Sequence, residues 1–138
     1  MKKSIKQSII YLLLSILAKR LVRFFSPIAW AIAAIKVAFT KDMGWDDLHN
    51  YFEGVAVSYD QTANAENGIY YNDIMITKMS LNEFGFPDET LSSVFGKNKR
   101  SLTLTKFGSF WAWFLNKIER QHVEKSIEED EGSHFKKK

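Results

Sequence analysis

The sequence predicts a mainly α protein, in which an N-terminal apolar helical segment is followed by a small helical domain with at most a short strand or hairpin. Only 7 Gly and 2 Pro occur among 138 residues, so loops should be few. Apolar residues recur at helical spacing in several segments. The 11 Phe, 5 Tyr and 4 Trp supply the core of one domain. The absence of Cys excludes a disulfide scaffold and a thiolate zinc site.

Charge divides the chain into unequal parts. Residues 1–41 hold eight basic side chains and no acid, whereas the remaining 97 residues hold 11 basic and 16 acidic side chains, a net charge of −5. Basic character therefore belongs to one apolar segment, which points to a membrane rather than to specific nucleic-acid binding. We predict a membrane-associating segment at residues 1–41, a compact helical domain at 42–130 and a frayed basic tail at 131–138.

The N-terminal segment has two apolar stretches. Ile9–Ala18 is too short to cross a bilayer, which needs about 20 apolar residues. Leu21–Phe39 is long enough if Arg23 and Lys36 extend toward the two interfaces, and Pro27 should kink it or begin a new helix. The alternatives are an amphipathic helix lying in the headgroup plane, a pair of buried helices in a soluble protein, and a cleaved signal peptide. If the segment spans, its basic flank keeps the N-terminus cytoplasmic and localises the protein to the inner membrane.

The domain is predicted from stripes of apolar residues and from turn signals. A helix should run from about Asp46 to Ala65 and end at Asn67-Gly68. Four further elements are expected in order: a short strand or loop at 69–79, a short helix at 87–96 with Gly96 just after its end, an exposed basic turn at 97–100, and a long helix at about 102–129. The long helix should direct an apolar face toward the core, formed by Phe107, Phe110, Trp111, Phe114 and Ile118.

Three polar groups could carry chemistry. Asp60 and Asn64 share one helix face, and Asp88-Glu89-Thr90 begins a helix, although solvation and capping explain both groups equally well. His122 continues the apolar stripe, so it should be largely buried, with Ser126 or a carboxylate of Asp60 or Glu89 as its partner. Asp60, Glu89 and His122 are the candidate catalytic residues. The candidate polar network comprises Gln61, Asn64, Asp88, Thr90, Ser92, Ser93 and Ser126.

Taken in order, these residues resemble a small family of uncharacterised tailed-phage and prophage proteins. The resemblance rests on Asp60-Gln61 with Asn64, then Gly68, the run Pro87–Ser93, Phe110-Trp111, and His122 with Ser126. It covers about half the chain, roughly Val55–Ile127. Val94 stands where the family commonly has Arg, and Val123 stands where it often has Cys. No metal and no cofactor are therefore expected.

Two functions are expected from these observations. The first is a small membrane-associated phage or prophage accessory or structural protein at the host envelope, with the membrane and another phage or host envelope protein as partners. The virion or the soluble cytoplasm is the alternative location. The second is a small hydrolase that uses a carboxylate–His–Ser constellation, with Ser92, Ser93 or Ser126 as nucleophile. No phosphate-binding loop, dinucleotide fingerprint, zinc-protease motif or nucleophile elbow is present.

Overall fold

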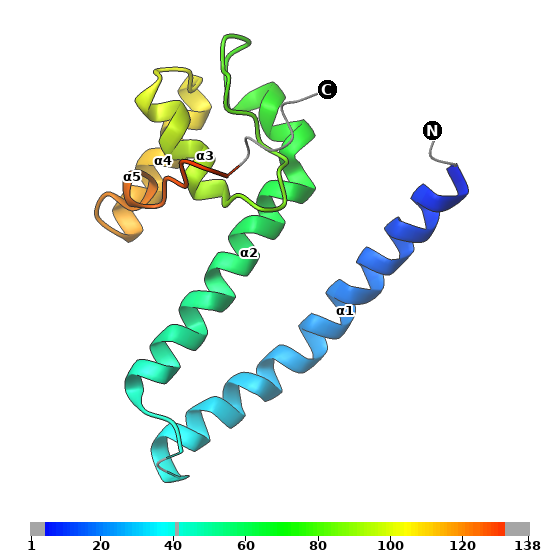
Figure 1. The fold of residues 1–138 in the computed structure, drawn as a ribbon, viewed down its shortest axis with the longest axis vertical. Coiled ribbons are helices and arrows are strands. Elements are labelled where there is room, and N and C mark those ends of the chain that lie inside the picture. Colours follow the sequence, from blue (N-terminus) through cyan, green and yellow to red (C-terminus); the bar gives the residue numbers. More distant parts are fainter. Residues whose placement is uncertain (1–4, 41, 132–138) are drawn as a thin grey trace. The chain divides into compact units, whose positions relative to one another are not determined.

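A computed structural model describes residues 5–40 and 42–131, and these residues are mainly helical, as the sequence predicts (Figure 1). Helices account for 74% of the structure. The elements in order are α1 (Ile5–Ile35), a π-helical turn η1 (Lys36–Thr40), α2 (Trp45–Ile74), α3 (Leu91–Arg100), α4 (Lys106–Ile118) and α5 (His122–Lys125). Within the described ranges the only β pairing is one isolated antiparallel bridge, between Ile76 and Leu104.

The chain forms two compact units, of which one ends at Phe52 and the other begins at Glu53, inside α2. We call the second the C-terminal unit. The predicted boundary at residue 41 falls before α2, and the predicted basic residues Lys2, Lys3 and Lys41 and the tail 132–138 lie outside the described residues.

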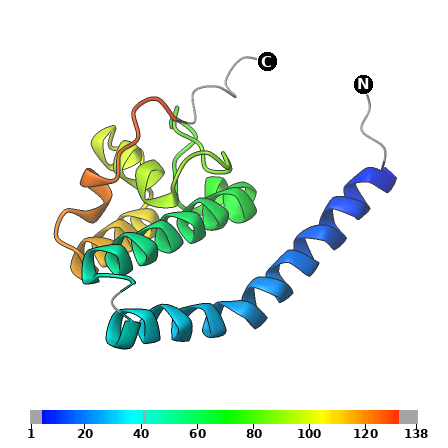
Figure 2. The ribbon, with the colours of Figure 1, turned by 60° about the horizontal axis from the view of Figure 1, so that its bottom comes forward.

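In the first unit, α1 is one continuous helix across both apolar stretches. Figure 2 shows it as a single curved helix, and Pro27 lies inside it without ending it. Its large apolar side chains are exposed, from 40% at Trp30 to 81% at Ile5. One helix, spanning Gln7–Thr40, is long and apolar enough to cross a membrane.

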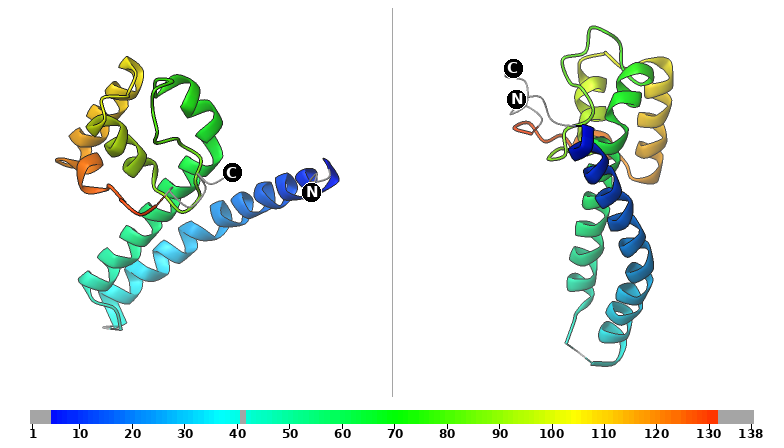
Figure 3. Two further views of the ribbon diagram at one scale, coloured as in Figure 1. Left: turned by 45° about the horizontal axis from the view of Figure 1, so that its top comes forward. Right: turned by 90° about the vertical axis from the view of Figure 1, so that its right-hand side faces the viewer.

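The prediction that α2 ends at Asn67-Gly68 is wrong, because the helix continues to Ile74. The glycine serves a close backbone contact rather than a turn. A Cβ at Gly68 would lie 2.3 Å from the Cα of Gly85, so only glycine lets the two backbones approach. The segment after α2 then runs back beside its C-terminal half (Figure 3), with Gly85 at a φ of +114°.

The predicted short helix starts later and ends later than expected. Thr90 caps α3, and its hydroxyl accepts a hydrogen bond from the Ser93 amide at 3.2 Å. Gly96 lies inside the helix, and glycine is required there because a Cβ would lie 2.1 Å from the Val123 carbonyl oxygen. The expected exposed turn at 97–100 is instead helical, and Lys97 is buried. Every residue from Ser92 to Asn98 is buried, so α3 is the central helix of the C-terminal unit.

The predicted long helix at 102–129 begins later, at Lys106, and is broken between Ile118 and His122. Leu102 and Gln121 adopt left-handed backbone angles, with φ of +57° and +59°. Thr105 caps the start of α4, which ends at Ile118. After the turn, the Val123 amide of α5 donates a hydrogen bond to the Asn116 side chain of α4 at 3.0 Å. These turns bring both α4 and α5 into contact with α3, which a continuous helix could not achieve.

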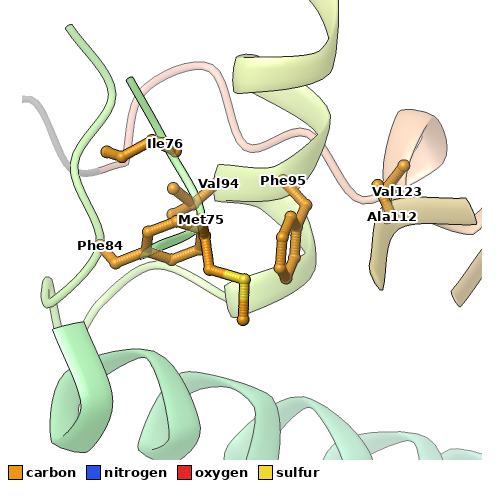
Figure 4. Close-up of a cluster of buried hydrophobic side chains, with 7 residues drawn as sticks. All are labelled: Met75, Ile76, Phe84, Val94, Phe95, Ala112 and Val123. Atoms are coloured by element: carbon orange, nitrogen blue, oxygen red, sulfur yellow. The ribbon is translucent and has the colours of Figure 1, made fainter. Parts of the chain in front are cut away.

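The apolar core of the C-terminal unit is small (Figure 4). It contains Met75, Ile76, Phe84, Val94, Phe95, Ala112 and Val123. The Phe84 and Phe95 rings pack edge to face, with centroids 5.2 Å apart. The largest fully buried side chains include Asn64, Asn98 and Ser93 beside Val94 and Val123, so hydrogen bonding contributes much of the specificity of this core.

Candidate functional site

A stripe of residues on α2 holds the segment that leads into α3. Asn64 is fully buried and makes three hydrogen bonds to this segment. Its side-chain nitrogen donates to the carbonyls of Phe86 at 3.0 Å and Glu89 at 2.8 Å, and its oxygen accepts from the Gly85 amide at 2.9 Å. One carboxamide therefore fixes three backbone groups at once.

Two further side chains extend this stripe in both directions. Asp60 accepts from the Ser92 amide at 3.1 Å. Asn72 donates to the Phe84 carbonyl at 3.0 Å and accepts from its amide at 2.7 Å. These bonds pack the Asp60/Asn64 face of α2 against the Asp88–Ser93 element. Sequence reasoning missed Asn72, although the four-residue spacing from Asp60 through Asn64 and Gly68 leads to it.

The first amides of α3 are bound by the chain's own side chains. The Asp60 carboxylate accepts a hydrogen bond from the Ser92 amide, and the Thr90 hydroxyl accepts one from the Ser93 amide. The Glu128 carboxylate accepts a third, from the Thr90 amide, at 3.0 Å. Carboxylates at this position satisfy the free amides of the helix start and complement its dipole. Gln61 adds a contact of 3.4 Å to the Asp88 carbonyl.

Glu89 belongs to a buried ion pair rather than to an open site. Its carboxylate lies 2.6 Å from the Lys97 ammonium and accepts from the Ser93 hydroxyl at 2.8 Å. Burial raises the pKa of Glu89, while the hydrogen bonds from Lys97 and Ser93 oppose that shift. Lys97 also donates to the Glu131 carbonyl at 2.9 Å, and the Ser93 hydroxyl accepts from the Glu128 amide at 2.9 Å. Lys97 and Ser93 therefore join α3 to the chain that follows α5, and Glu89 contacts both of them.

His122 connects a serine to a carboxylate. Its Nε2 lies 3.0 Å from the Ser92 hydroxyl oxygen, and its Nδ1 lies 2.8 Å from the Glu119 carboxylate. The predicted carboxylate partners of His122 were wrong, because Glu119 takes that position from the turn before α5. The His122 side chain is 31% exposed, so it is partly buried rather than largely buried as expected. The hydrogen bond to His122, with a second from Lys125, lowers the pKa of Glu119.

Ser126 has a local role that the sequence did not suggest. Its hydroxyl donates to the backbone carbonyl of His122 at 2.7 Å and so closes the end of α5. Ser92 is therefore the serine that contacts the imidazole. Sequence reasoning missed Glu119, although its three-residue spacing before His122 is typical of neighbouring side chains on a helix.

These groups border a cavity of about 700 Å³ in the C-terminal unit. Of the predicted residues, Asp60, Thr90, Ser92, His122 and Ser126 line it, together with the unpredicted Glu53, Glu119 and Glu128. Gln61, Asn64, Asp88, Glu89 and Ser93 do not. Four carboxylates and one lysine, Lys125, make its wall acidic. Nowhere in residues 5–40 and 42–131 do His, Asp and Glu side chains form a group that could hold a metal ion.

The fold and the site define a mainly α chain with one apolar helix of membrane-crossing length and a small C-terminal unit joined by polar side chains. Compared with known protein families, with curated proteins and with solved structures, the chain matches none.

Proposed function

We propose that this protein is a small membrane-associated accessory or structural protein, of the phage or prophage kind that its motifs resemble, and that it acts at the host envelope. One observation carries the proposal. An 18-residue window within Gln7–Thr40 has a mean hydropathy of 1.6, yet only 6% of that window is buried within the structure. In a soluble protein the apolar side chains of such a helix are buried against other parts of the fold. In a membrane they can contact the lipid acyl chains instead.

The arrangement of charge supports the orientation that we propose. Basic residues precede the stretch at Leu21–Phe39, and acidic residues begin at Asp42. The positive-inside bias then keeps the N-terminus in the cytoplasm and carries the C-terminal unit across the inner membrane. The polar stripe of α2 gives that unit a fixed shape, which suits a protein that presents a surface to a phage or host envelope protein.

The experiment is carbonate extraction of the full-length chain expressed in bacteria, combined with intact-mass measurement. We expect the chain in the membrane fraction at its full mass. Recovery entirely in the soluble fraction would contradict the proposal. Loss of the N-terminal mass would instead identify the segment as a cleaved signal peptide.

A small hydrolase is the second candidate, because Glu119, His122 and Ser92 form a continuous hydrogen-bonded chain on the wall of a cavity. Such a chain could activate Ser92 as a nucleophile, with His122 accepting its proton. Against this candidate, Ser92 is 2% exposed, and the amides of Ser92 and Ser93 are bound by Asp60 and Thr90. An oxyanion needs such donors free to receive it.

A fluorophosphonate probe tests the hydrolase directly. If Ser92 is a nucleophile, the probe adds its mass to the chain, and both Ser92→Ala and His122→Gln abolish the addition. Ser126→Ala is the matched control and should label like the parent chain, because its hydroxyl contacts only backbone among the bonds described. Absence of labelling, or labelling that survives Ser92→Ala, rules out a nucleophilic role for Ser92.

A further inference from the structure

The helix α4 has its small residues inside and its aromatic residues outside. Gly108 and Ala112 are buried against the C-terminal unit. A Cβ at Gly108 would lie 2.1 Å from the Met75 carbonyl oxygen, so the close packing requires glycine. The large apolar side chains point away from that contact and are 37–71% exposed: Phe107, Phe110, Trp111, Trp113, Phe114 and Ile118. We call these six residues the aromatic face.

This arrangement contradicts the sequence-based expectation that Phe107, Phe110, Trp111, Phe114 and Ile118 face the core. Small residues at 108 and 112 allow the backbone of α4 to approach its neighbours, which turns the large side chains outward. The aromatic rings contact one another in a row, with centroids 5.7 Å apart for both Phe110–Trp111 and Trp111–Phe114. A continuous exposed apolar surface of this kind is typical of an interaction site.

The charge around the aromatic face indicates what covers it. The charged side chains of α4 itself are Lys106 and Lys117, and both are basic, although residues 42–138 as a whole carry a net charge of −5. Lys106 and Lys117 lie at the two ends of α4 and are exposed. The Lys117 ammonium lies 5.6 Å from the centre of the Trp113 ring. Tryptophan and phenylalanine flanked by lysine suit the boundary between anionic headgroups and acyl chains.

A recess beside the aromatic face favours lipid over a flat protein surface. A cavity of about 300 Å³ opens between the end of α2 and α4. Its walls are mostly apolar and include Tyr70, Ile74, Phe107 and Trp111. An acyl chain can enter an apolar recess of this kind without leaving buried polar groups unpaired.

We propose that the aromatic face of α4 lies in the interfacial layer of an anionic lipid bilayer, as a second membrane contact beside α1. This inference rests on the proposed membrane association of the chain. Once α1 tethers the protein, the local concentration of the aromatic face at the bilayer is high, and a contact of modest affinity suffices.

Tryptophan quenching by brominated lipids tests the contact in the full-length chain. The chain is reconstituted in vesicles of phosphatidylcholine and phosphatidylglycerol with bromines on the acyl chains. One variant keeps Trp113 alone, with phenylalanine at positions 30, 45 and 111. A second keeps Trp30 in α1 alone, and a third lacks all four and carries Glu83→Trp in an exposed loop. We expect about a twofold loss of emission for Trp113, as for a side chain roughly 5–10 Å deep. We expect strong quenching for Trp30 and none for Glu83→Trp.

The outcomes separate the two proposals. Quenching of Trp30 without Trp113 overturns the contact of α4 and leaves the membrane role of α1 intact. Quenching of neither overturns the proposed function itself. A blue-shifted Trp113 emission without quenching assigns the aromatic face to a second copy of the chain, and equal quenching of Glu83→Trp shows unspecific adsorption; both overturn the inference.

A charge variant checks the role of the anionic headgroups. Lys106→Glu with Lys117→Glu, added to the chain that keeps Trp113, should remove most of the quenching at that residue. Both lysines are exposed, so circular dichroism should show an unchanged fold. In vesicles of phosphatidylcholine alone, the chain that keeps Trp113 and both lysines should show the same loss of quenching. Undiminished quenching in both cases contradicts the role of anionic lipid.

Discussion

The helices α1 and α3 reverse the usual relation between polarity and burial. In α1, which has 31 residues, Ala33 is the one buried residue among the side chains described, although most of the helix is apolar. In α3, which has 10 residues, seven consecutive residues are buried, and they include Ser92, Ser93, Lys97 and Asn98. In α3, polar side chains are buried because they are hydrogen-bonded. In α1, where apolar residues are densest, almost none of the described side chains is buried.

The difference teaches that the two regions suit different surroundings. The backbone of α1 satisfies its own hydrogen bonds, which is the condition for a helix in hydrocarbon. The side chains around α3 satisfy one another in a small unit whose apolar core is limited, so each polar bond there has a large effect. Four substitutions would break or sharpen this comparison, and they follow from the largest expected effect to the smallest.

Lys97→Met should have the largest effect, because it leaves the buried carboxylate of Glu89 without its cation. Breaking a buried pair in this way should lower the free energy of unfolding by about 4 kcal/mol at neutral pH. Burial already raises the pKa of Glu89 above its unfolded value. A raised pKa contributes stability below the unfolded pKa, and this stability is lost as pH rises through the folded pKa. The defect should therefore shrink toward acidic pH, as measured by urea unfolding in detergent.

Lys99→Met is the matched control for this substitution. Lys99 pairs with Glu124 on the surface, so its loss should cost about 0–1 kcal/mol. A defect of Lys97→Met that matches this control, or that grows as pH falls, would show that the buried pair does not stabilise α3.

Asn64→Ala should cost about 3 kcal/mol, because three backbone groups lose a buried partner. Thermal unfolding followed by circular dichroism measures the loss. Asn67→Ala on the same helix should change stability little, since the Asn67 side chain donates to Ala63 within α2. Similar melting temperatures for the two variants would refute the importance of the α2 stripe.

Ile32→Lys tests the other region. A charge near the centre of a spanning helix should weaken insertion by about 2.5–3.5 kcal/mol and increase the fraction released by carbonate. Ile69→Lys places the same change at a residue of the C-terminal unit that is 88% exposed, and it should leave extraction unchanged. If Ile32→Lys is retained as firmly as the parent chain, α1 does not cross the bilayer between Leu21 and Phe39.

Glu119→Gln should have the smallest effect. The hydrogen bond to His122 lowers the pKa of Glu119, so its contribution exists above the unfolded pKa and is lost as pH falls through the folded pKa. Both side chains are partly or largely exposed, which limits the contribution. The variant should melt slightly below the parent chain at neutral pH and together with it under strongly acidic conditions. A large loss at neutral pH would give the Glu119–His122 pair a structural weight comparable to that of Glu89–Lys97.

The sequence alone determined the mainly helical class and the presence of an apolar N-terminal helix, because both depend on local periodicity and composition. It also identified Asp60, Asn64, Ser92 and His122, since short polar residues among apolar stripes need partners. The sequence pattern also indicates a helix cap near Thr90, and residue spacing could have identified Asn72 and Glu119.

Only the tertiary structure decided which glycines end helices and which lie beneath another backbone. Gly68 and Gly96 indicate helix ends in the sequence, yet both lie inside helices. Glycine is needed at each position because a neighbouring backbone occupies the space that a side chain would take. The same holds for the aromatic face, which periodicity directs inward and Gly108 and Ala112 turn outward. The local sequence pattern predicts that a segment is helical. Which face of that helix is buried depends on how closely another segment approaches it.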